Sequence, residues 1–331
     1  MAAATSAIPA GPPSPPQSAL FTAPGRPRPL ARRLAIHNRV VASLRDFFGR
    51  RGFHEIPVTA MADHPARIQL EGMIAPIGDA LIAHAKLKPG ERVIDVGCGG
   101  GPTTLTIAER VSPGGLALGL DVSPMLIEKA QARANALTRA PDAAALSFIL
   151  DDAATATPAA APFDVLFSRF GVMFFDDPYP AFAHMRTWLK PDGRTEFACW
   201  ASIDENPWIK EIGAIIAKYI ETPPPDPTAP GPLALADQDR TRDILQTAGF
   251  ADPAFTLHRD VQLMGGPGAS PAEAAAFTMS GMHVGQALAE ESDAVKAQVE
   301  ADLVALYEGC VTPRGVALPS AAWFVTAQNR G

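Results

Sequence analysis

The amino-acid sequence predicts an α/β fold, in which one mostly parallel sheet carries helices on both of its faces. Two observations predict it. Short apolar strands alternate with amphipathic helical segments from about residue 64 onward, and nearly half of the 331 residues are apolar, which is enough for a large core. Strands that alternate with helices are joined by crossover connections, so neighbouring strands run parallel.

The first 63 residues stand apart from this pattern. Residues 1–30 are mostly Ala, Pro, Ser and Gly and have little to bury, so we expect a disordered tail. Residues 31–63 begin with apolar side chains at helical spacing, and we expect a helical appendage there. The main domain is therefore predicted to span 64–331.

Strands and helices then alternate in a regular order. A helix over about 68–86 is separated by Pro89-Gly90 from the first strand at 92–96. The elements expected next are a helix at 103–111, a strand at 116–120, a helix at 124–138, strands at 146–150 and 163–168, a helix at 178–189, a turn at 191–193 and a strand at 194–200.

The alternation becomes less regular after residue 200. Helices are expected at 208–219 and 240–248, and strands at 255–263 and 323–326, which brings the sheet to seven strands. The helical segment 271–309 lies between the last two strands. We interpret it as a helical cap that contributes to a substrate site.

Composition excludes several classes of protein. The net charge of −7 argues against nucleic-acid binding through the overall field, and no run of 18 apolar residues predicts a membrane-spanning helix. Three cysteines, Cys98, Cys199 and Cys310, lie far apart and form no CxxC motif. We therefore expect no structural metal and no disulfide framework, as in a cytoplasmic protein.

A glycine-rich segment, DVGCGGG at 95–101, directly follows the first strand. Parallel sheets bind ligands at the carboxyl ends of their strands, so this turn is a candidate binding loop. A dinucleotide fingerprint that starts at Gly97 needs a third glycine at the position of Pro102, and Asp95 stands where that fold usually has an apolar side chain. No Gly-Lys-Ser/Thr follows either, which excludes a P-loop.

Acidic residues also close the next two predicted strands. Asp121 follows the second strand, and Asp151 and Asp152 follow the third. A carboxylate at the second strand can accept hydrogen bonds from ribose hydroxyls, and one at the third can accept from the amine of adenine. Together with Asp95, these acids favour S-adenosylmethionine, which has a zwitterionic amino-acid part and no pyrophosphate.

With these features the chain resembles the class I S-adenosylmethionine-dependent methyltransferases, most closely the branch that includes the ubiquinone and menaquinone C-methyltransferases. The resemblance covers about 64–331, although the characteristic carboxyl-terminal segment of the quinone-pathway members is not found. It implies a Rossmann-like fold and methyl transfer by in-line displacement to a small, apolar or aromatic acceptor. The matching segments are VIDVGCGGGPTT, GLDVSPMLIEKA, FILDDAA, FDVLFSRFGVMFFDDP and LKPDGRTEFACW.

The same resemblance implies a set of cofactor-binding residues. Ser168 is expected to face the methyl donor, Arg169 and Phe170 to line the acceptor side, and the helical segment 74–78 to close over the cofactor. The implied cofactor-binding residues are Asp95, Gly97, Cys98, Gly99, Gly101, Asp121, Val122, Met125, Asp151, Asp152, Ala153 and Ser168.

The sequence assigns no catalytic base, but His283 and Tyr179 are candidates because either could reach an acceptor near the fourth strand. An apolar acceptor pocket is expected from Phe277, Met279, Met282, Val284 and Leu288 of the cap. A non-catalytic adenosylmethionine-binding regulatory protein is the alternative function, and a nicotinamide oxidoreductase is disfavoured by Pro102. A homodimer is possible.

Overall fold

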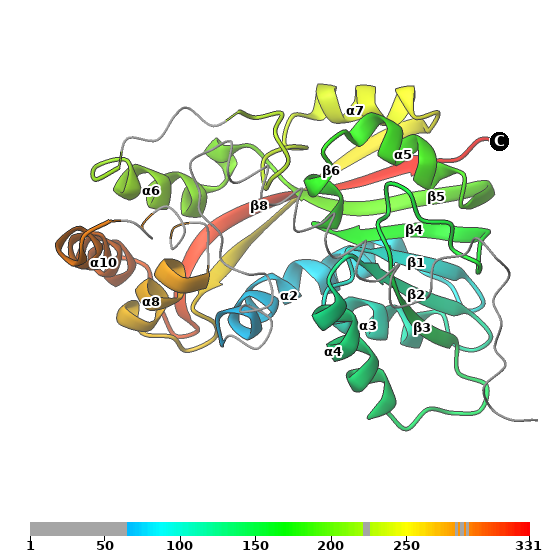
Figure 1. Ribbon diagram of the computed structural model, residues 1–331, viewed down its shortest axis with the longest axis horizontal. Coiled ribbons are helices and arrows are strands. Elements are labelled where there is room, and N and C mark those ends of the chain that lie inside the picture. Colours follow the sequence, from blue (N-terminus) through cyan, green and yellow to red (C-terminus); the bar gives the residue numbers. More distant parts are fainter. Residues whose placement is uncertain (1–64, 221–225, 282–283, 285–287, 289–290) are drawn as a thin grey trace, which may run out of the picture.

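The structure is a computed structural model that describes residues 65–331, with gaps at 221–225, 282–283, 285–287 and 289–290 (Figure 1). The tail expected at 1–30 and the appendage expected at 31–63 lie outside the described residues.

One mixed sheet organises the described chain (Figure 1). Its strand order is β3-β2-β1-β4-β5-β8-β6, and the first five strands of this order are parallel while β8 is antiparallel to both of its neighbours. The short β7 pairs only with β8, so the sheet has eight strands rather than the predicted seven. The strands are β1 (Arg92–Val96), β2 (Leu116–Asp121), β3 (Ala145–Leu150), β4 (Phe163–Arg169), β5 (Leu189–Trp200), β6 (Ala251–Met264), β7 (Val311–Thr312) and β8 (Gly315–Gln328).

Helices cover both faces of this sheet, as predicted. The pair α3 and α4, which follows β1 and β2, lies on one side and the pair α5 and α7 on the other (Figure 1). Within the described ranges, no helix combines the length and apolar character that crossing a bilayer requires. The helices are α2 (Pro65–Ala85), α3 (Pro102–Arg110), α4 (Pro124–Asn135), α5 (Pro178–Arg186), α6 (Pro207–Ile216), α7 (Gln238–Thr247), α8 (Pro271–Gly281) and α10 (Asp293–Glu308), with short 3-10 turns η2 (Gly171–Phe174) and η3 (Ile203–Glu205).

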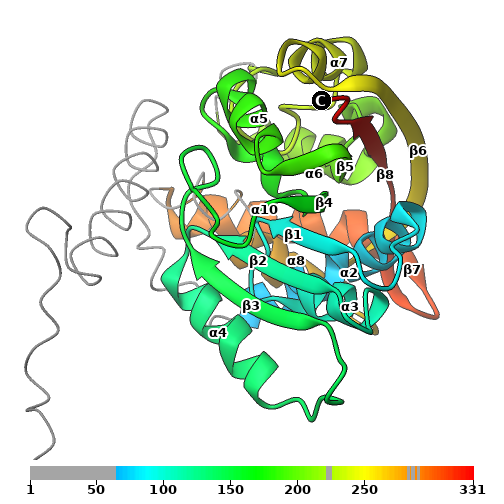
Figure 2. The same cartoon turned by 90° about the vertical axis from the view of Figure 1, so that its right-hand side faces the viewer.

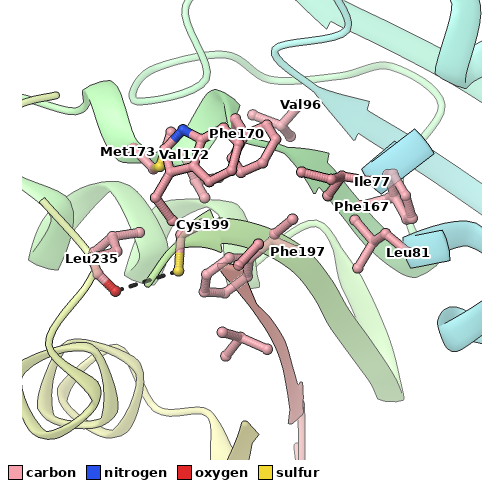
Figure 3. Close-up of a cluster of buried hydrophobic side chains, with 14 of the residues drawn as sticks. Ile77, Leu81, Val96, Phe167, Phe170, Val172, Met173, Phe197, Cys199 and Leu235 are labelled. Carbon is pink, nitrogen blue, oxygen red and sulfur yellow. Dashed lines mark hydrogen bonds between the residues drawn. The ribbon is translucent and has the colours of Figure 1, made fainter. Parts of the chain in front are cut away.

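The core lies between the sheet and these helices. Strand β1 is buried along most of its length, which explains why it reads as a continuous apolar run with a single acid. Figure 3 shows Ile77 and Leu81 of α2 beside Phe167 of β4, and all three side chains are buried. Burial of these apolar side chains stabilises the packing of α2 against the end of the sheet.

The antiparallel strands β6 and β8 extend beyond the parallel part of the sheet. The register of β5 against β8 ends at the pair Trp200–Ala322, whereas β6 continues along β8 to the pair Met264–Val316. This two-stranded extension leads to α8 and α10, which pack on each other beyond the carboxyl ends of the parallel strands (Figures 1 and 2). Within the segment 271–309, α8 and α10 are helical, and the contribution of the segment to a substrate site stays a prediction.

Several boundaries differ from those predicted, and the largest differences are at the starts of β5 and β8. The helix expected at 178–189 ends at Arg186, and β5 starts at Leu189 and runs through the expected turn at 191–193 with a register irregularity opposite β4. Strand β8 begins at Gly315, well before the expected 323. Both strands are lengthened by pairing with distant partners, which a local apolar pattern does not reveal.

Asn206 ties the end of the parallel sheet to the antiparallel strands. It is fully buried, and its amide group donates to the carbonyl oxygens of Ala201, Ser202 and Ala321 at 3.0–3.1 Å. Its oxygen accepts from the indole N–H of Trp208 and from the amide of Ala321. One side chain therefore satisfies buried groups from β5, α6 and β8.

We expect Asn206→Ala to lower the free energy of unfolding by about 2–3 kcal/mol, because it leaves several buried donors and acceptors without partners. Denaturant unfolding followed by circular dichroism measures this change. The exposed Asn135→Ala at the end of α4 is the matched control and is expected to change stability little. Equal effects of the two substitutions would contradict the role given to Asn206.

Candidate functional site

The turn between β1 and α3 has a backbone that favours glycine. Gly97, Gly99 and Gly101 have φ values of +71°, +57° and +82°, in the left-handed region that side chains disfavour. The amides of Gly97 and Cys98 both donate to the carbonyl oxygen of Leu120, at 2.8 and 3.1 Å, which fixes the turn against the end of β2. The spacing G-x-G-x-G is thus a conformational requirement.

The three glycines have different surroundings. A Cβ atom at Gly97 would lie 2.7 Å from the Cα of Gly171, and one at Gly101 would lie 2.8 Å from the Cβ of Ala130. A Cβ atom at Gly99 would meet no atom of the described chain within 4 Å. Gly97 and Gly101 are therefore needed for packing, whereas the backbone at Gly99 is open to an approaching molecule.

Asp95 is a buried acid with one unused oxygen. Its side chain is 1% exposed, Oδ2 accepts a hydrogen bond of 2.6 Å from the Thr104 hydroxyl, and Oδ1 has no partner. Burial raises its pKa to about 7, against the opposing effects of the Thr104 hydrogen bond and the Arg169 charge. An unpaired carboxylate oxygen at this place fits a cationic group such as an ammonium.

Asp121 connects the glycine turn to the end of β2. Its Oδ2 accepts from the amide of Gly99 at 2.9 Å and its Oδ1 accepts from the amide of Ser123 at 2.8 Å. A carboxylate at the end of the second strand is a group that can accept hydrogen bonds from ribose hydroxyls. Val122 and Met125, which follow it, are half-buried apolar side chains.

The acids after β3 lie next in the same row. The amide of Asp151 donates to the carbonyl oxygen of Asp121, which joins the ends of β3 and β2. Asp152 is half-buried, its Oδ1 accepts from the amide of Ala154, and Ala153 is buried. The structure thus brings the predicted acids of β1, β2 and β3 to one edge of the sheet.

Two of the residues expected in this site, Cys98 and Ser168, have side chains that are already engaged within the protein. The Cys98 side chain is buried beside Ile127 and Phe148, and burial raises the pKa of its thiol. The Ser168 hydroxyl is fully buried and donates to the carbonyl oxygen of Val96 at 2.8 Å, so it links β4 to β1. The sequence pattern does not show that this hydroxyl is already engaged.

The end of β4 presents a cation and an aromatic ring. Arg169 is half-buried, and its Nε is buried without a hydrogen-bond partner. Phe170 has a φ of +64°, and its ring stacks on Trp200 with the centroids 4.3 Å apart. Figure 3 shows Phe170 beside Val172 and Met173, and all three side chains are buried.

Helix α2 reaches over the glycine turn and is held there by charges. Glu71 accepts from Arg133 at 2.8 Å and from Lys129 at 3.2 Å, both on α4, and Arg133 also donates to the carbonyl oxygen of Gly100. Burial alone would raise the pKa of Glu71, but the two cations outweigh it and lower the pKa. The expected closing segment 74–78 lies within this helix.

Of the two candidate bases, the structure describes Tyr179. His283, together with Met282 of the expected acceptor pocket, lies outside the described residues. The Tyr179 hydroxyl donates to Asp243 of α7 at 2.8 Å in an exposed hydrogen bond. Of the expected acceptor-pocket side chains that the structure describes, Phe277, Val284 and Leu288 are buried and Met279 is half-buried.

Two residues of the site are not predicted by the sequence pattern. The threonine that holds Asp95, Thr104, is part of the segment VIDVGCGGGPTT, so its place after the turn could have indicated it. Nothing in the pattern points to Glu71, because its partners lie 58 and 62 residues away. No cluster of side chains suited to a metal ion occurs within the described residues.

Comparisons with known proteins are consistent with this geometry. Residues 93–193 match a family described as a methyltransferase domain. Aklanonic acid methyltransferase DauC of Streptomyces sp. (strain C5) is 34% identical over 122 residues, 37% of this chain and 54% of that protein. Trans-aconitate 2-methyltransferase of Methylobacterium radiotolerans is 36% identical over 113 residues, 34% of this chain and 39% of that protein. The YcgJ protein of Bacillus subtilis, a solved structure, has a TM-score of 0.49 and 16% identity, and the match covers 77% of this chain and 98% of that one.

The matches to the curated relatives are partial. The chain spans about half the length of the first of them and less of the other. The family match nevertheless extends from β1 into β5 and includes the glycine turn, Asp121, Asp152 and Ser168.

We expect Gly97→Ala to destabilise the protein more than Gly99→Ala. Both substitutions place a side chain at positive φ, which costs about 1–2 kcal/mol. Only the Cβ atom at position 97 also collides with backbone, at Gly171, which adds about 1–3 kcal/mol. Denaturant unfolding of both variants without ligand tests this order, and a larger loss for Gly99→Ala would contradict the assigned surroundings.

Proposed function

We propose that this chain, which carries a class I S-adenosylmethionine-dependent methyltransferase domain, transfers the methyl group of that cofactor to a small acceptor molecule. The observation that carries the proposal is the edge formed by β1, β2 and β3. There an unpaired buried oxygen of Asp95, the open backbone of Gly99 and the carboxylate of Asp121 lie along one row.

The residues of this row fit the parts of adenosylmethionine. Asp95 suits the ammonium of the methionine part, and Gly99 allows the backbone to approach the ligand closely. Asp121 stands at the end of β2, where a carboxylate can accept hydrogen bonds from ribose hydroxyls. At the other end, Asp152 and Ala153 are placed for the adenine. The remaining assigned residues, which shape the turn or pack on the adenosine, are Gly97, Cys98, Gly101, Val122, Met125, Asp151 and Ser168.

The protein's own task in such a transfer is to align the two reactants and keep water out. Adenosylmethionine supplies an activated methyl group on a sulfonium. Helix α2, held over the turn by Glu71 and against β4 by Ile77 and Leu81, covers the site on one side. The helices α8 and α10 lie beyond the strand ends, and we propose that they form the acceptor side.

An acidic acceptor agrees with the lack of an assigned base. A carboxylate is already ionised near neutral pH, so it can attack the methyl carbon without losing a proton first. Two of the curated relatives are named for acids, aklanonic acid and trans-aconitate. We therefore extend the expected class of small, apolar or aromatic acceptors to those that carry an acidic group.

Other expectations stay predictions. They are the domain boundary at residue 64, the cytoplasmic location, the absence of nucleic-acid binding and a possible homodimer. The described cysteines Cys98, Cys199 and Cys310 carry free thiols.

Transfer of labelled methyl groups tests the proposed function. The full chain is incubated with adenosylmethionine labelled in its methyl group and with a panel of aromatic carboxylic acids, phenols and amines. We expect label in at least one acidic or phenolic acceptor. Binding of adenosylhomocysteine without transfer to any member of the panel would favour a non-catalytic adenosylmethionine-binding protein instead.

We expect Asp121→Ala to weaken adenosylhomocysteine binding by at least about tenfold, since hydrogen bonds to a charged group contribute about 1.5–3 kcal/mol each. Asp121→Asn keeps the shape and one acceptor oxygen, and its loss of affinity is expected to be smaller. Isothermal titration measures both. The control is Asp142→Ala in the exposed loop before β3, and equal affinities for Asp121→Ala and this control would contradict the ribose role.

Binding is also expected to depend on pH through Asp95. Its pKa of about 7 means that the carboxyl is largely protonated at pH 6 and ionised at pH 7.5. A bound ammonium favours the ionised form, so binding releases a proton and the affinity for adenosylhomocysteine rises several-fold over this range. Titrations at several pH values test this. Asp95→Asn should remove the dependence, and an affinity that falls as the pH rises would contradict the assignment.

A further inference from the structure

Arg169 is a cation without a partner at the edge of the proposed site. It is the last residue of β4, in register with Ala198 of β5. Its Nε is buried with no hydrogen-bond partner, and its guanidinium forms no ion pair or hydrogen bond with the described part of the chain. A charge that is largely buried is costly unless it is paired, so this guanidinium is suited to binding an anion.

Helix α2 confines this side chain at the open end of the sheet. A Cβ atom at Gly78 would lie 3.0 Å from the Cδ of Arg169 and 3.2 Å from one of its terminal nitrogens. Gly78 is next to Ile77, which packs with Leu81 in the core beside β4 (Figure 3). The guanidinium therefore lies between the strand end and the helix that covers the glycine turn.

The carboxylates around Arg169 influence its pKa without forming an ion pair with it. Burial lowers its pKa, and the negative charges of Asp95, Glu71 and Asp79 raise it, with Asp95 the strongest of the three. None of these carboxylates is close enough to form an ion pair with it. Glu71 is instead engaged with Lys129 and Arg133. An unpaired guanidinium and the unpaired oxygen of Asp95 thus lie near the same strand ends.

We propose that Arg169 is a carboxylate-binding residue of this site. A guanidinium presents parallel N–H groups that match the two oxygens of a carboxylate, which gives this pairing both strength and a defined orientation. The inference rests on the proposed function, because two carboxylates can then reach this place. One belongs to the methionine part of the cofactor, whose ammonium suits Asp95, and the other to an acidic acceptor.

Binding measurements on Arg169→Gln and Arg169→Lys test the proposal and separate the two sources. The probes are adenosylhomocysteine and 5′-methylthioadenosine, which lacks the amino-acid part. If the cofactor supplies the carboxylate, Arg169→Gln binds adenosylhomocysteine at least about tenfold more weakly and methylthioadenosine unchanged. Arg169→Lys keeps the positive charge but not the planar guanidinium, so its affinity for adenosylhomocysteine is expected to lie between those of the wild type and Arg169→Gln.

The second arm uses protein saturated with adenosylhomocysteine and compares benzoate with benzamide. If the acceptor supplies the carboxylate, benzoate raises the Tm of the wild type but not of Arg169→Gln, and benzamide raises neither. Arg186→Gln is the matched control, since Arg186 also has a buried Nε without a partner but lies on α5 against Gly249. This variant is expected to bind every probe as the wild type does.

The outcomes are distinct. Equal responses of the wild type and Arg169→Gln to all carboxylate probes, with methylthioadenosine still bound, would overturn the role of Arg169 and leave the proposed function standing. A wild type that binds neither nucleoside would overturn the proposed function, and this inference with it.

Discussion

The carboxylate of Asp121 is the contact on which the rest of the site depends. By accepting from Gly99 and Ser123, it joins the turn after β1 to the end of β2 and to the start of α4. The backbone of β2 adds a second link, through the carbonyl oxygen of Leu120. These bonds hold the glycine turn, in which a Cβ atom at Gly99 would meet no described atom within 4 Å, whereas Gly97 and Gly101 are closely packed. A parallel sheet alone would bring the strand ends together without this open position at Gly99.

Charge is distributed unevenly over this edge, and the imbalance is what makes it a site. Within the described chain, one buried oxygen of Asp95 and the guanidinium of Arg169 have no partner, whereas Glu71 of α2 is paired with Lys129 and Arg133 of α4. Exclusion of water by α2 strengthens every electrostatic interaction beneath it. The same helix packs on β4 through apolar side chains (Figure 3). The placement of α2 over Asp95 and Arg169 therefore depends on this packing.

The sequence predicts the parallel half of the fold well because buried parallel strands are short apolar runs that end in glycine or acid. The strands β1 to β4 lie within a residue of their expected limits, and the acids fall at the expected strand ends. The strands β5, β6 and β8 start before their expected limits, since their extra length comes from pairing with distant strands. Side-chain partners are also beyond a local pattern, which is why the engaged hydroxyl of Ser168 and the unpaired Arg169 emerge only in three dimensions.

The central claim is that this edge binds adenosylmethionine and not a dinucleotide, because Pro102 replaces the third glycine of a dinucleotide turn and Asp95 suits an ammonium. Isothermal titration of the full chain with adenosylhomocysteine, and separately with NAD⁺, tests this claim most directly. The account predicts saturable binding of adenosylhomocysteine, one per chain, and no measurable binding of NAD⁺. Binding of NAD⁺ in the absence of any adenosylhomocysteine binding would contradict it.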